Sequence, residues 1–565
     1  MKRLFVSILG SVLSALLLWL AFPPVDWGWL AWFALVPLML ALRSLSRPRQ
    51  GCLIGLVWGA CFYGMLLWWM QQFVHRWTGS FWLGLAAWGA LVLSQTLFAG
   101  AFGWIYTLVN RFARGSALPV AWTAGLWVAI EWLRGAGAWG FLWGQLAVSQ
   151  HRNLLPLQSV ELLGVWGLSA WLVVVNASVA EAVVQRKMRP LLGAVELSAL
   201  LLLFGWWRLS LPSAPERLTA LVVQPSVDTT RQWDETMQQQ VKSSLSLALE
   251  SAVREKVNMV LFPESLVPDA TAYPFSDLIR QATARSVTVL IGTFDEEYGR
   301  SYNTVTAFLP DGGAETYRKQ HLVPWGEYVP FRRWTPWVEH FGVVSADVSP
   351  GKRLVLLTPW RIGTPICFES TLPRISCEMV RQGARLLCVV TNDTWFGRSP
   401  AAEQHLAFCA LRAVETRRWV LRSATTGISA VFDAQGRCLH RAELFTEAQL
   451  RAYYRENLHL FRHPEQAYVR LVAVRDPERA SRLRARAAGG EDFAQLARRY
   501  SEHFTKDRGG EWGWVSRGVR EWEPVFRLRP GEVSEPFAWR GLWWVVKAEK
   551  FRGPGVQPFE EVQEQ

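Results

Sequence analysis

Residues 257–265 read VNMVLFPES, a short apolar run that ends at a proline and a carboxylate. Two similar runs flank it along the chain, LTALVV at 218–223 and VTVLIG at 287–292. Longer segments with a helical pattern occupy the intervals at 233–255 and 274–284. Short β-like runs that alternate with helices are typical of an α/β domain whose helices pack over a sheet.

The same alternation continues to about residue 418. Further candidate strands are 303–309, 354–358, 361–366 and 385–391, and a further candidate helix is 401–418. We assign residues 218–444 to this α/β domain.

Three reactive side chains stand at or near the ends of these runs. Glu264 follows the run quoted above, Lys319 lies in YRKQHL at 317–322, and Cys367 closes the run IGTPI at 362–366. A thiol is a useful nucleophile only as the thiolate, so a base must take its proton. A carboxylate can do this, and a neighbouring lysine can stabilise the oxyanion on an attacked carbonyl. The three residues are therefore candidate catalytic groups for acyl transfer through a thioester, although a cysteine ending a buried strand is more often a small core residue.

The N-terminal residues 1–211 have a different character, dense in Leu, Trp, Ala, Val and Gly. Seven stretches come close to the ~20 apolar residues that a membrane-spanning helix needs. They are 4–22, 28–45, 51–73, 81–109, 117–134, 158–185 and 190–211. The first follows Lys2 and Arg3 but lacks a small-x-small cleavage site, so we expect a retained helix rather than a signal peptide. The sequence predicts a multi-pass helical membrane bundle.

Positive charges in the loops predict the orientation of this bundle. One set of helix ends carries Lys2, Arg3, Arg43, Arg47, Arg49, Arg111, Arg114, Arg186, Lys187 and Arg189, and the opposite set carries Arg76, Arg134 and Arg152. Because cytoplasmic loops are rich in Lys and Arg, this bias predicts a cytoplasmic N-terminus. Seven crossings would place the chain after about residue 211 outside, which is the periplasm if the membrane is a bacterial inner membrane.

Two ionisable residues stand inside the predicted fifth span. Glu131 and Arg134 are three positions apart, so they share one face of a helix. They either pair with each other or line a path for substrate.

Composition excludes other classes of function. The net charge of +13 fits loop charges of a membrane protein, and no basic stripe interleaved with aromatic residues indicates nucleic-acid binding. The seven cysteines contain no C-x-x-C pair, so we expect no zinc or redox motif, no metal and no other cofactor.

The sequence motifs around the three candidate residues resemble those of a known family. The matching stretches are FPES at 262–265, YRKQHLVPWGEYVP at 317–330, CFE at 367–369, TNDTWFG at 391–397, QHL at 404–406, RSATTGIS at 422–429, EWLR at 131–134 and LGVWG at 163–167. In chain order the first three resemble the nitrilase superfamily. The whole set is similar to its apolipoprotein N-acyltransferase branch, over about residues 1–440.

The resemblance implies a fold, a reaction and further site residues. The fold would be a helical membrane bundle joined to a nitrilase-like αββα sandwich. An acyl chain would pass from a phospholipid to Cys367, and then to the α-amine of the diacylglyceryl-cysteine that begins a lipoprotein. Glu327 would tune Lys319, and Trp233 and Glu369 match other positions that serve the site. Phe368 would serve the site beside them.

The chain departs from the family pattern in three ways. Phe368 stands where the family usually has tyrosine, so the ring is kept and the hydroxyl is lost. The sequence QPS at 224–226 replaces the usual QGN. After about residue 440 no apolar run is long enough to span a membrane, whereas the family has an eighth, C-terminal helix.

Residues 445–565 resemble a different family, the parvulin-type prolyl isomerases. The matching words include GEDF at 490–493, GGEWG at 509–513 and PGEVS at 530–534. The resemblance implies a small α/β domain. Leu471 and either Trp543 or Trp544 take the places of the family's paired histidines, so we expect poor turnover and a role in binding unfolded or proline-containing peptides. His503 does not match those places, and we interpret it as a surface residue.

Two alternatives to lipoprotein N-acylation remain open at this point. One is a membrane-tethered amidase of the nitrilase superfamily, in which water resolves the thioester. The other is a weakened scaffold that holds exported chains through the parvulin-like residues.

Overall fold

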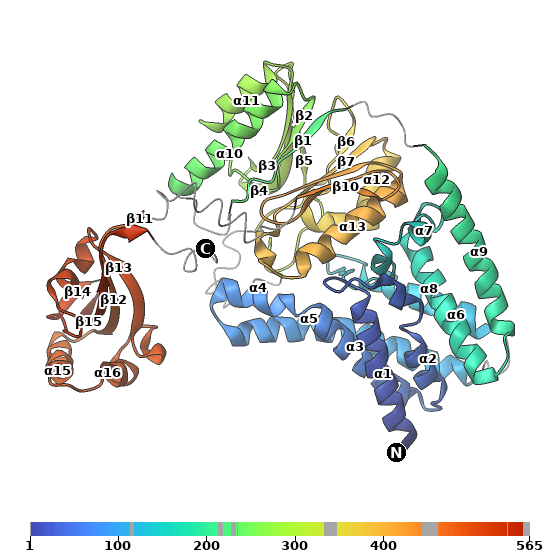
Figure 1. The fold of residues 1–565 in the computed structure, drawn as a ribbon, viewed down its shortest axis with the longest axis horizontal. Helices are drawn as coiled ribbons and strands as arrows, with labels where there is room; N and C mark the ends of the chain where they lie inside the picture. The colour runs from blue at the N-terminus through green and yellow to red at the C-terminus, as the bar shows by residue number, and fades with distance from the viewer. Residues whose placement is uncertain are drawn as a thin grey trace. The chain divides into compact units, whose positions relative to one another are not determined.

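The computed structural model of the protein describes residues 2–112, 118–212, 218–227, 233, 235–330, 332, 347–442, 462–539 and 541–556. The chain forms two compact units, Met1–Leu444 and Phe445–Gln565 (Figure 1).

Apolar helices form the N-terminal bundle of the first unit. They are α1 (Lys2–Leu20), η1 (Gly28–Trp32), α2 (Val36–Arg43), α3 (Pro48–Leu66), α4 (Trp69–Thr78), α5 (Phe81–Asn110), α6 (Leu118–Arg134), η2 (Leu146–Gln150), α7 (Leu154–Leu157), α8 (Val160–Gln185) and α9 (Arg189–Ser210). Local sequence explains several ends. The Ser80 hydroxyl accepts the Leu83 N–H at the start of α5, and α4 ends at Gly79, whose φ of 68° suits glycine.

Among the described residues, fewer than the seven predicted spans are found as single long apolar helices, and the predicted number stays a prediction. Among the described residues, four helices are long and apolar enough to cross a membrane: α1, α5, α8 and α9. The pair α3 and α4 would make a fifth, bent by 54°. The predicted span 28–45 is broken, because η1 stops at Trp32 and α2 starts afresh at Val36, with Pro37 in its first turn, where proline is tolerated. The predicted span 117–134 forms α6, which has 17 residues.

Helices α3 and α5 pack unusually closely because small residues line their contact. A Cβ at Gly55 would lie 2.1 Å from the Ala99 carbonyl oxygen, and one at Gly103 would lie 2.2 Å from the Gly51 oxygen. Small residues that let backbones approach are typical of helix contacts within membranes.

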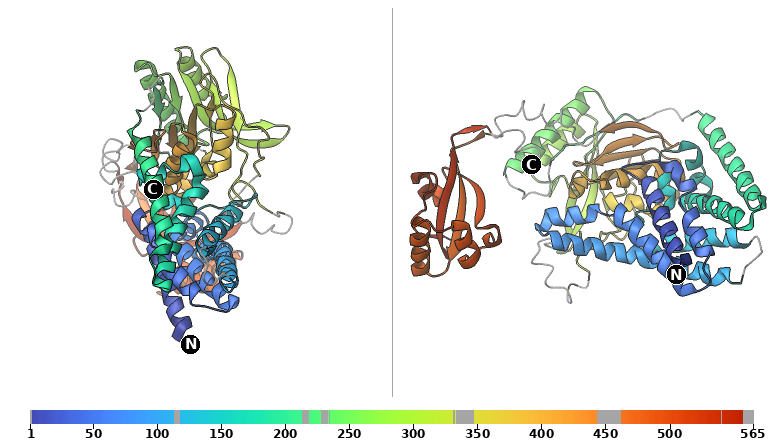
Figure 2. Two further views of the ribbon diagram at one scale, coloured as in Figure 1. Left: turned by 90° about the vertical axis from the view of Figure 1, so that its right-hand side faces the viewer. Right: turned by 60° about the horizontal axis from the view of Figure 1, so that its bottom comes forward.

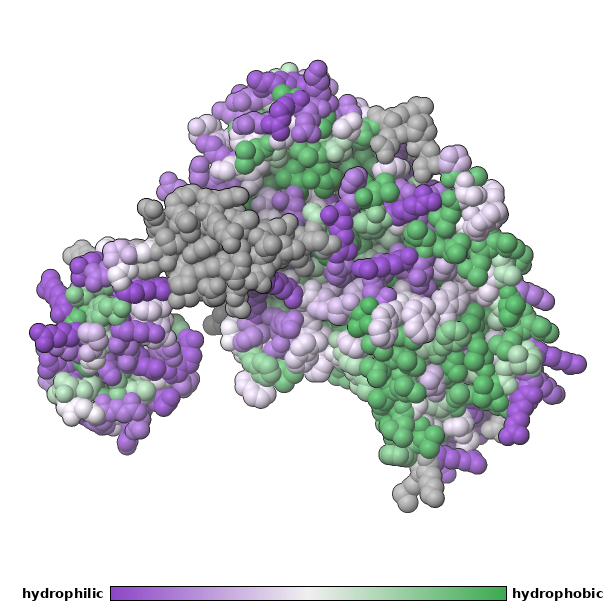
Figure 3. All heavy atoms as spheres, in the orientation of Figure 1, coloured by the Kyte–Doolittle hydropathy of each residue, from purple (hydrophilic) through white to green (hydrophobic). Residues whose placement is uncertain are grey.

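The outer surface of the bundle is apolar. Figure 3 shows hydrophobic surface, in green, gathered over bundle helices. On α1 and α9 large apolar side chains face outward, including Phe5 at 62%, Leu200 at 67% and Trp206 at 65% exposed. Contiguous apolar surface of this kind suits a lipid environment rather than water.

Two five-stranded sheets form the α/β part of the first unit. One sheet has the order β1-β2-β3-β4-β5, and the other β10-β9-β8-β7-β6. Their strands are β1 (Ala220–Val222), β2 (Met259–Leu261), β3 (Thr288–Glu297), β4 (Arg300–Phe308), β5 (Ala314–Arg318), β6 (Ile362–Gly363), β7 (Leu386–Thr391), β8 (Val420–Ala424), β9 (Ser429–Phe432) and β10 (Cys438–Ala442). The helices are α10 (Glu235–Arg254), α11 (Phe275–Thr283), η5 (Cys367–Thr371), α12 (Pro373–Arg381), η6 (Asp393–Phe396) and α13 (Ala401–Thr416).

Alternation of side chains along the strands produces the four layers. Met259 and Leu261 of β2 face the core shared with the second sheet, whereas Val260 between them packs under α10 and α11. Helices α12 and α13 contribute Met379 and Phe408 to the core on the side of the second sheet. This arrangement confirms the predicted αββα sandwich.

Some elements differ from those predicted. The segment 354–358 contributes only one bridge, from Leu357 to Ile362, rather than a strand. Strands β5, β8, β9 and β10 and helix α12 were not among the predicted elements. The order of the sheets depends on pairing between distant segments, which local pattern does not report.

The bundle and the sandwich share one continuous hydrophobic core. Gln404 of α13 accepts a hydrogen bond from Trp69 Nε1 at 3.1 Å and donates one to the Pro23 carbonyl at 3.1 Å. At the other end of α13, Arg417 binds Glu161 at the start of α8 at 2.5 Å. Figure 2 shows the long bundle helices running side by side, with the sandwich beyond one end of them.

The second unit is a small α/β domain. Its four-stranded sheet has the order β13-β12-β15-β14, and β11 pairs with β16. The elements are β11 (Arg462–His463), β12 (Gln466–Val474), α15 (Pro477–Ala488), α16 (Phe493–Tyr500), η8 (Lys506–Arg508), β13 (Glu511–Ser516), η9 (Arg520–Arg527), β14 (Phe537–Trp539), β15 (Leu542–Arg552) and β16 (Gly555–Val556).

One face of this sheet carries a cluster of aromatic rings. Leu471 and Trp544 are buried together on that face with Trp522, whereas Trp543 packs on the opposite face with α15 and α16. Trp544 is therefore the residue that shares a face with Leu471. The surface interpretation of His503 is wrong, because its ring is partly buried 5.1 Å from that of Trp544.

Candidate active site

Lys319 lies between two carboxylates. It directly follows β5, while Glu264 lies three residues beyond the end of β2 in the same sheet. Lys319 Nζ is 3.1 Å from Glu264 Oε1 and 2.9 Å from Glu327 Oε2, and its side chain is 1% exposed. Burial disfavours the charged amine, but the two carboxylates outweigh it and hold the lysine pKa well above its usual value. The site therefore contains a permanent buried cation.

Two amide groups keep the carboxylates in place. Asn303 of β4 donates through Nδ2 to Glu264 Oε1 and to Glu327 Oε1, both at 2.8 Å. The Asn392 backbone N–H donates to Glu264 Oε2 at 2.8 Å. The Glu264 carboxylate therefore accepts hydrogen bonds from both sheets, since Asn303 lies in the first sheet and Asn392 follows β7 of the second.

Cys367 comes from the second sheet and starts the short helix η5. Ile366 before it forms a bridge to Val390 of β7, and Cys367 itself has a φ of 51°, a left-handed conformation uncommon for residues other than glycine. Burial raises the pKa of its thiol well above the ordinary value; the Glu264 carboxylate raises it further, while Lys319 opposes both effects. The resting thiol is thus protonated and needs a base.

The structure brings Glu264, Lys319, Glu327 and Cys367 into one electrostatically coupled site. The charges of both Glu264 and Lys319 act on the Cys367 thiol. Two segments from one sheet and one from the other meet where their strands end, which is where the sequence placed them.

Glu369 ties the lysine segment to the cysteine segment through the backbone. Its buried carboxylate accepts from the Gln320 N–H at 2.7 Å, the His321 N–H at 3.0 Å and the Ile366 N–H at 2.9 Å. Tyr317 adds its hydroxyl at 3.0 Å. Burial raises the pKa of Glu369, and these donors oppose that shift. The carboxylate thereby sets the spacing between Lys319 and Cys367.

Phe368 connects the site to the membrane bundle. Its ring stacks on Trp143 at 5.9 Å and on Phe141 at 6.3 Å, both in the loop after α6, and on His321 at 5.7 Å. Burial lowers the pKa of His321 to about 4, with Arg374 and Lys319 adding to the shift. The aromatic stack makes an apolar wall beside the thiol.

Trp233 is not placed with these residues by any contact that the structure describes. Its ring lies 6.2 Å from Phe275 of α11 and belongs to the edge of the core under α10 and α11. Its predicted service to the site stays a prediction.

Sequence reasoning missed several polar groups near the thiol. Asn303 carries a signal in retrospect, since it is an amide in a strand that is otherwise buried and largely uncharged. The sequence motifs that resemble the family also contain Asp393, His405 and Arg422, to which the sequence assigned no role. These three residues form a buried hydrogen-bonded chain behind Cys367.

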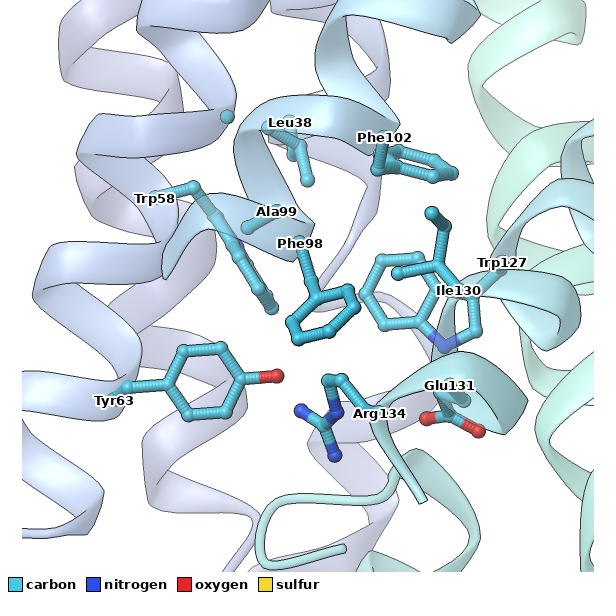
Figure 4. A pocket seen from close by; sticks show the side chains of 11 residues that line it. Leu38, Trp58, Tyr63, Phe98, Ala99, Phe102, Trp127, Ile130, Glu131 and Arg134 are labelled. Carbon is cyan, nitrogen blue, oxygen red and sulfur yellow. The ribbon is translucent and has the colours of Figure 1, made fainter. Parts of the chain in front are cut away.

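The predicted pairing of Glu131 with Arg134 is wrong. Glu131 Oε1 instead accepts the Leu146 N–H at 2.8 Å, and Arg134 Nη2 donates to the Trp143 carbonyl at 3.2 Å. Figure 4 shows the Arg134 guanidinium extending into a pocket between Tyr63 and Glu131. The role in a substrate path stays a prediction.

Within the part of the chain that the structure describes, no group of three or more His, Cys, Asp or Glu residues is arranged to hold a metal ion.

Comparison with known proteins gives matches to all three parts of the chain. The family profile "Apolipoprotein N-acyltransferase N-terminal domain" matches residues 14–178, "Carbon-nitrogen hydrolase" matches 219–454, and "PPIC-type PPIASE domain" matches 445–564.

Individual proteins match over most of the length. An apolipoprotein N-acyltransferase of Gloeobacter violaceus is 36% identical over 456 residues, which is 77% of this chain and 86% of that protein. One of Geobacter metallireducens is 31% identical over 466 residues, covering 78% of this chain and 88% of the relative. Among solved structures, the nitrilase-superfamily protein Nit3 of Saccharomyces cerevisiae is 17% identical, with a TM-score of 0.32, and the match covers 43% of this chain and 97% of that one.

Proposed function

The chain belongs to the apolipoprotein N-acyltransferase family, and from that premise we propose that it acylates lipoproteins through a Cys367 thioester. The acyl donor is a phospholipid, and the acceptor is the α-amine of the N-terminal diacylglyceryl-cysteine. The observation that supports this best is the buried Lys319 cation between Glu264 and Glu327, coupled to the thiol of Cys367.

The first half-reaction forms the thioester. Glu264 takes the thiol proton, and Cys367 Sγ attacks the ester carbonyl carbon of the phospholipid. The oxyanion that develops is stabilised by the Lys319 ammonium. When the intermediate collapses, the ester C–O bond breaks, Glu264 returns the proton to the departing glycerol oxygen, and a lysophospholipid leaves.

The second half-reaction uses the same groups in reverse. The free amine of the lipoprotein attacks the thioester carbonyl, and Glu264 accepts a proton from the attacking nitrogen. Collapse of the intermediate breaks the C–S bond, forms the amide and regenerates the Cys367 thiol. The buried aromatic wall of Phe368 and Trp143 surrounds the thiol with apolar groups, which favours a membrane-bound amine over water as acceptor. This supports acyl transfer over amide hydrolysis by a membrane-tethered amidase.

The family is a membrane family, and the apolar helices of this chain suit that environment. We propose a bacterial inner-membrane location with the N-terminus in the cytoplasm and both the sandwich and the second unit in the periplasm. The bias of Lys and Arg among the helix ends supports the cytoplasmic N-terminus, and an odd number of crossings, five or seven, would place the later parts of the chain outside. Reporter fusions after Trp207 should be active only outside the cytoplasm, and those near Gln185 only inside.

The second unit would bind unfolded or proline-containing peptides. The half-buried ring of Trp512, which packs against the buried Trp522 and Trp544, supports this, since aromatic rings of this kind pack against prolines and other apolar side chains. Binding there would bring exported chains to the enzyme.

Complementation tests the proposal. A strain depleted of its own N-acyltransferase should grow when it expresses this protein, and mass spectrometry should find a third acyl chain on a lipoprotein N-terminus. Cys367→Ala should abolish both, while Cys438→Ala, at an exposed cysteine of β10, should leave them intact. Acylation by the Cys367→Ala protein would overturn the proposed mechanism.

A further inference from the structure

A chain of fully buried polar groups runs behind the nucleophile. Arg422 Nη2 binds Asp393 Oδ2 at 2.6 Å, and Asp393 Oδ1 lies 3.0 Å from His405 Nδ1. Thr391 donates its hydroxyl to the same Asp393 oxygen at 2.9 Å. The side chains of Arg422, Asp393 and His405 are each 1% exposed or less. Such a network is costly to bury unless each member has partners, and here each has them.

The chain ends on the backbone of Cys367. His405 Nε2 lies 3.2 Å from the Cys367 carbonyl oxygen, and the Ser370 hydroxyl donates to that oxygen at 2.8 Å. A carbonyl only accepts, so this contact is a hydrogen bond in the tautomer that carries the proton on Nε2; the Ser370 hydroxyl lies 3.1 Å from the same nitrogen. Nδ1 lies beside an acceptor, the Asp393 carboxylate, and a donor, Arg422 Nη2 at 3.1 Å. It therefore has a hydrogen-bond partner whether or not it is protonated.

The orientation of this carbonyl matters for the reaction. The peptide between Cys367 and Phe368 is trans and planar, so the Phe368 N–H points to the opposite side from the carbonyl. No acceptor for the Phe368 N–H is found among the residues that the structure describes. A free backbone N–H directly after a nucleophile is placed to donate to the oxyanion.

The same contact holds a strained residue. Cys367 has a φ of 51°, a conformation that persists only where its surroundings impose it. Without a donor on its carbonyl, the peptide could rotate and Cys367 could relax, which would turn the Phe368 N–H away from the oxyanion.

We propose that His405 is a positioning residue for acyl transfer, which fixes the Cys367–Phe368 peptide so that its N–H is presented to the oxyanion. Asp393 and Arg422 in turn fix the imidazole. The inference rests on the proposed function, because it assigns a role within the same thioester-forming site.

Two substitutions of His405 separate positioning from simple packing. The amide nitrogen of glutamine can reach the place of Nε2 and still donate to the Cys367 carbonyl, whereas the amide of asparagine matches only Nδ1. A packing role predicts similar losses in both. A positioning role predicts that His405→Gln keeps acylation within about tenfold and that His405→Asn loses about a hundredfold or more, the usual effect of losing one oxyanion donor.

The experiment uses the full-length protein in detergent, with a p-nitrophenyl ester of a fatty acid as acyl probe. The burst of p-nitrophenolate gives the rate of thioester formation, and iodoacetamide labelling of Cys367, mapped by mass spectrometry, gives the reactivity of the thiol alone. Labelling should change little in either variant, because alkylation forms no oxyanion. The same pair of substitutions at His151, which binds Asp26 at 2.9 Å in the bundle, serves as a matched control and should leave the burst unchanged.

Should the His405 variants fail to fold, Ser370→Ala removes the other donor to the same carbonyl and should slow the burst severalfold without affecting labelling. Equal losses in His405→Gln and His405→Asn, or labelling that falls in parallel with the burst, would overturn the positioning role alone. A missing burst in the unsubstituted protein, with Cys367 still labelled, would overturn the proposed function and the inference with it.

Discussion

At the scale of single residues, the charge on Lys319 is the feature from which the site's behaviour follows. Two carboxylates and one ammonium are buried together, and their ion pairs offset the free-energy cost of desolvation only while all three groups keep their partners. Asn303 donates to both carboxylates, so a single amide maintains the separation of Glu264 from Glu327. Removal of Lys319 leaves both carboxylates without their cation, whereas removal of either glutamate leaves one ion pair.

Lys319→Met should therefore impair both activity and stability. Loss of the cation should slow acylation of Cys367 by about a hundredfold or more, and two unpaired buried carboxylates should cost about 3 kcal/mol of folding free energy. Burst kinetics and thermal unfolding in detergent measure the two effects. Lys352→Met, at an exposed lysine, is the control. Unchanged kinetics in Lys319→Met would remove the lysine from the mechanism.

His321 should make stability depend on pH. Its folded pKa is about 4 against an ordinary value of 6.5, so the unfolded chain binds more protons between these values. Stability should then fall as pH drops through that window, by about 2 kcal/mol between pH 7 and pH 5 from this group. Thermal unfolding of the protein and of His321→Gln over pH 7 to 5 measures it. An equally steep fall in the variant would assign the dependence to other groups.

Glu264, Lys319 and Cys367 could be predicted from sequence because each stands at the end of a short apolar run, and strand ends are where α/β domains gather reactive groups. The role of Asn303 could not, because its contacts depend on pairing between segments far apart in the chain, and the Asp393–His405 contact could not, because it depends on how η6 packs against α13.

At the scale of elements, the bundle shows where the hydropathy pattern of the sequence predicts the helices correctly and where it does not. Long uninterrupted apolar runs became α5, α8 and α9 nearly as predicted. Hydropathy alone did not register the break around Pro37 or the bend between α3 and α4. Both depend on backbone geometry and on the partner that each helix meets, and α3 meets α5 more closely than hydropathy can indicate.

The contact between α3 and α5 should be sensitive to a single methyl group. Gly55→Ala places a Cβ 2.1 Å from the Ala99 oxygen, so the helices must separate, and we expect a loss of about 1–3 kcal/mol. Gly64→Ala lies on the same helix but meets only Trp88 at 3.5 Å, so it should be neutral or slightly stabilising. Thermal unfolding in detergent compares the two. Equal effects would show that the close approach carries no energetic weight.

At the scale of the whole molecule, the two units have separate interiors. The cores around Leu471 and around Leu496 are built from the second unit alone, with no residue of the first. Among the described residues, its four-stranded sheet is likewise formed by strands of the second unit alone.

Residues Phe445–Gln565 should accordingly fold when expressed alone. They should bind proline-containing peptides weakly and show poor isomerase turnover, because Leu471 and Trp544 place apolar groups where a tuned polar pocket would be needed. Circular dichroism tests folding, and a coupled assay on a Xaa-Pro peptide tests turnover. Rates comparable to those of an intact parvulin would make the protein a two-activity enzyme.

The continuous core of the first unit has a consequence for how the protein is made. Helix α13 lies late in the chain, yet its Gln404 binds Trp69 and Pro23, which are synthesised hundreds of residues earlier. The bundle must therefore wait, with that end uncovered, until α13 has emerged from the ribosome and folded back onto it. During this interval the nascent chain is vulnerable to quality-control proteases. A slowly translated stretch just before residue 401 would lengthen the exposure, whereas one after residue 442 would not.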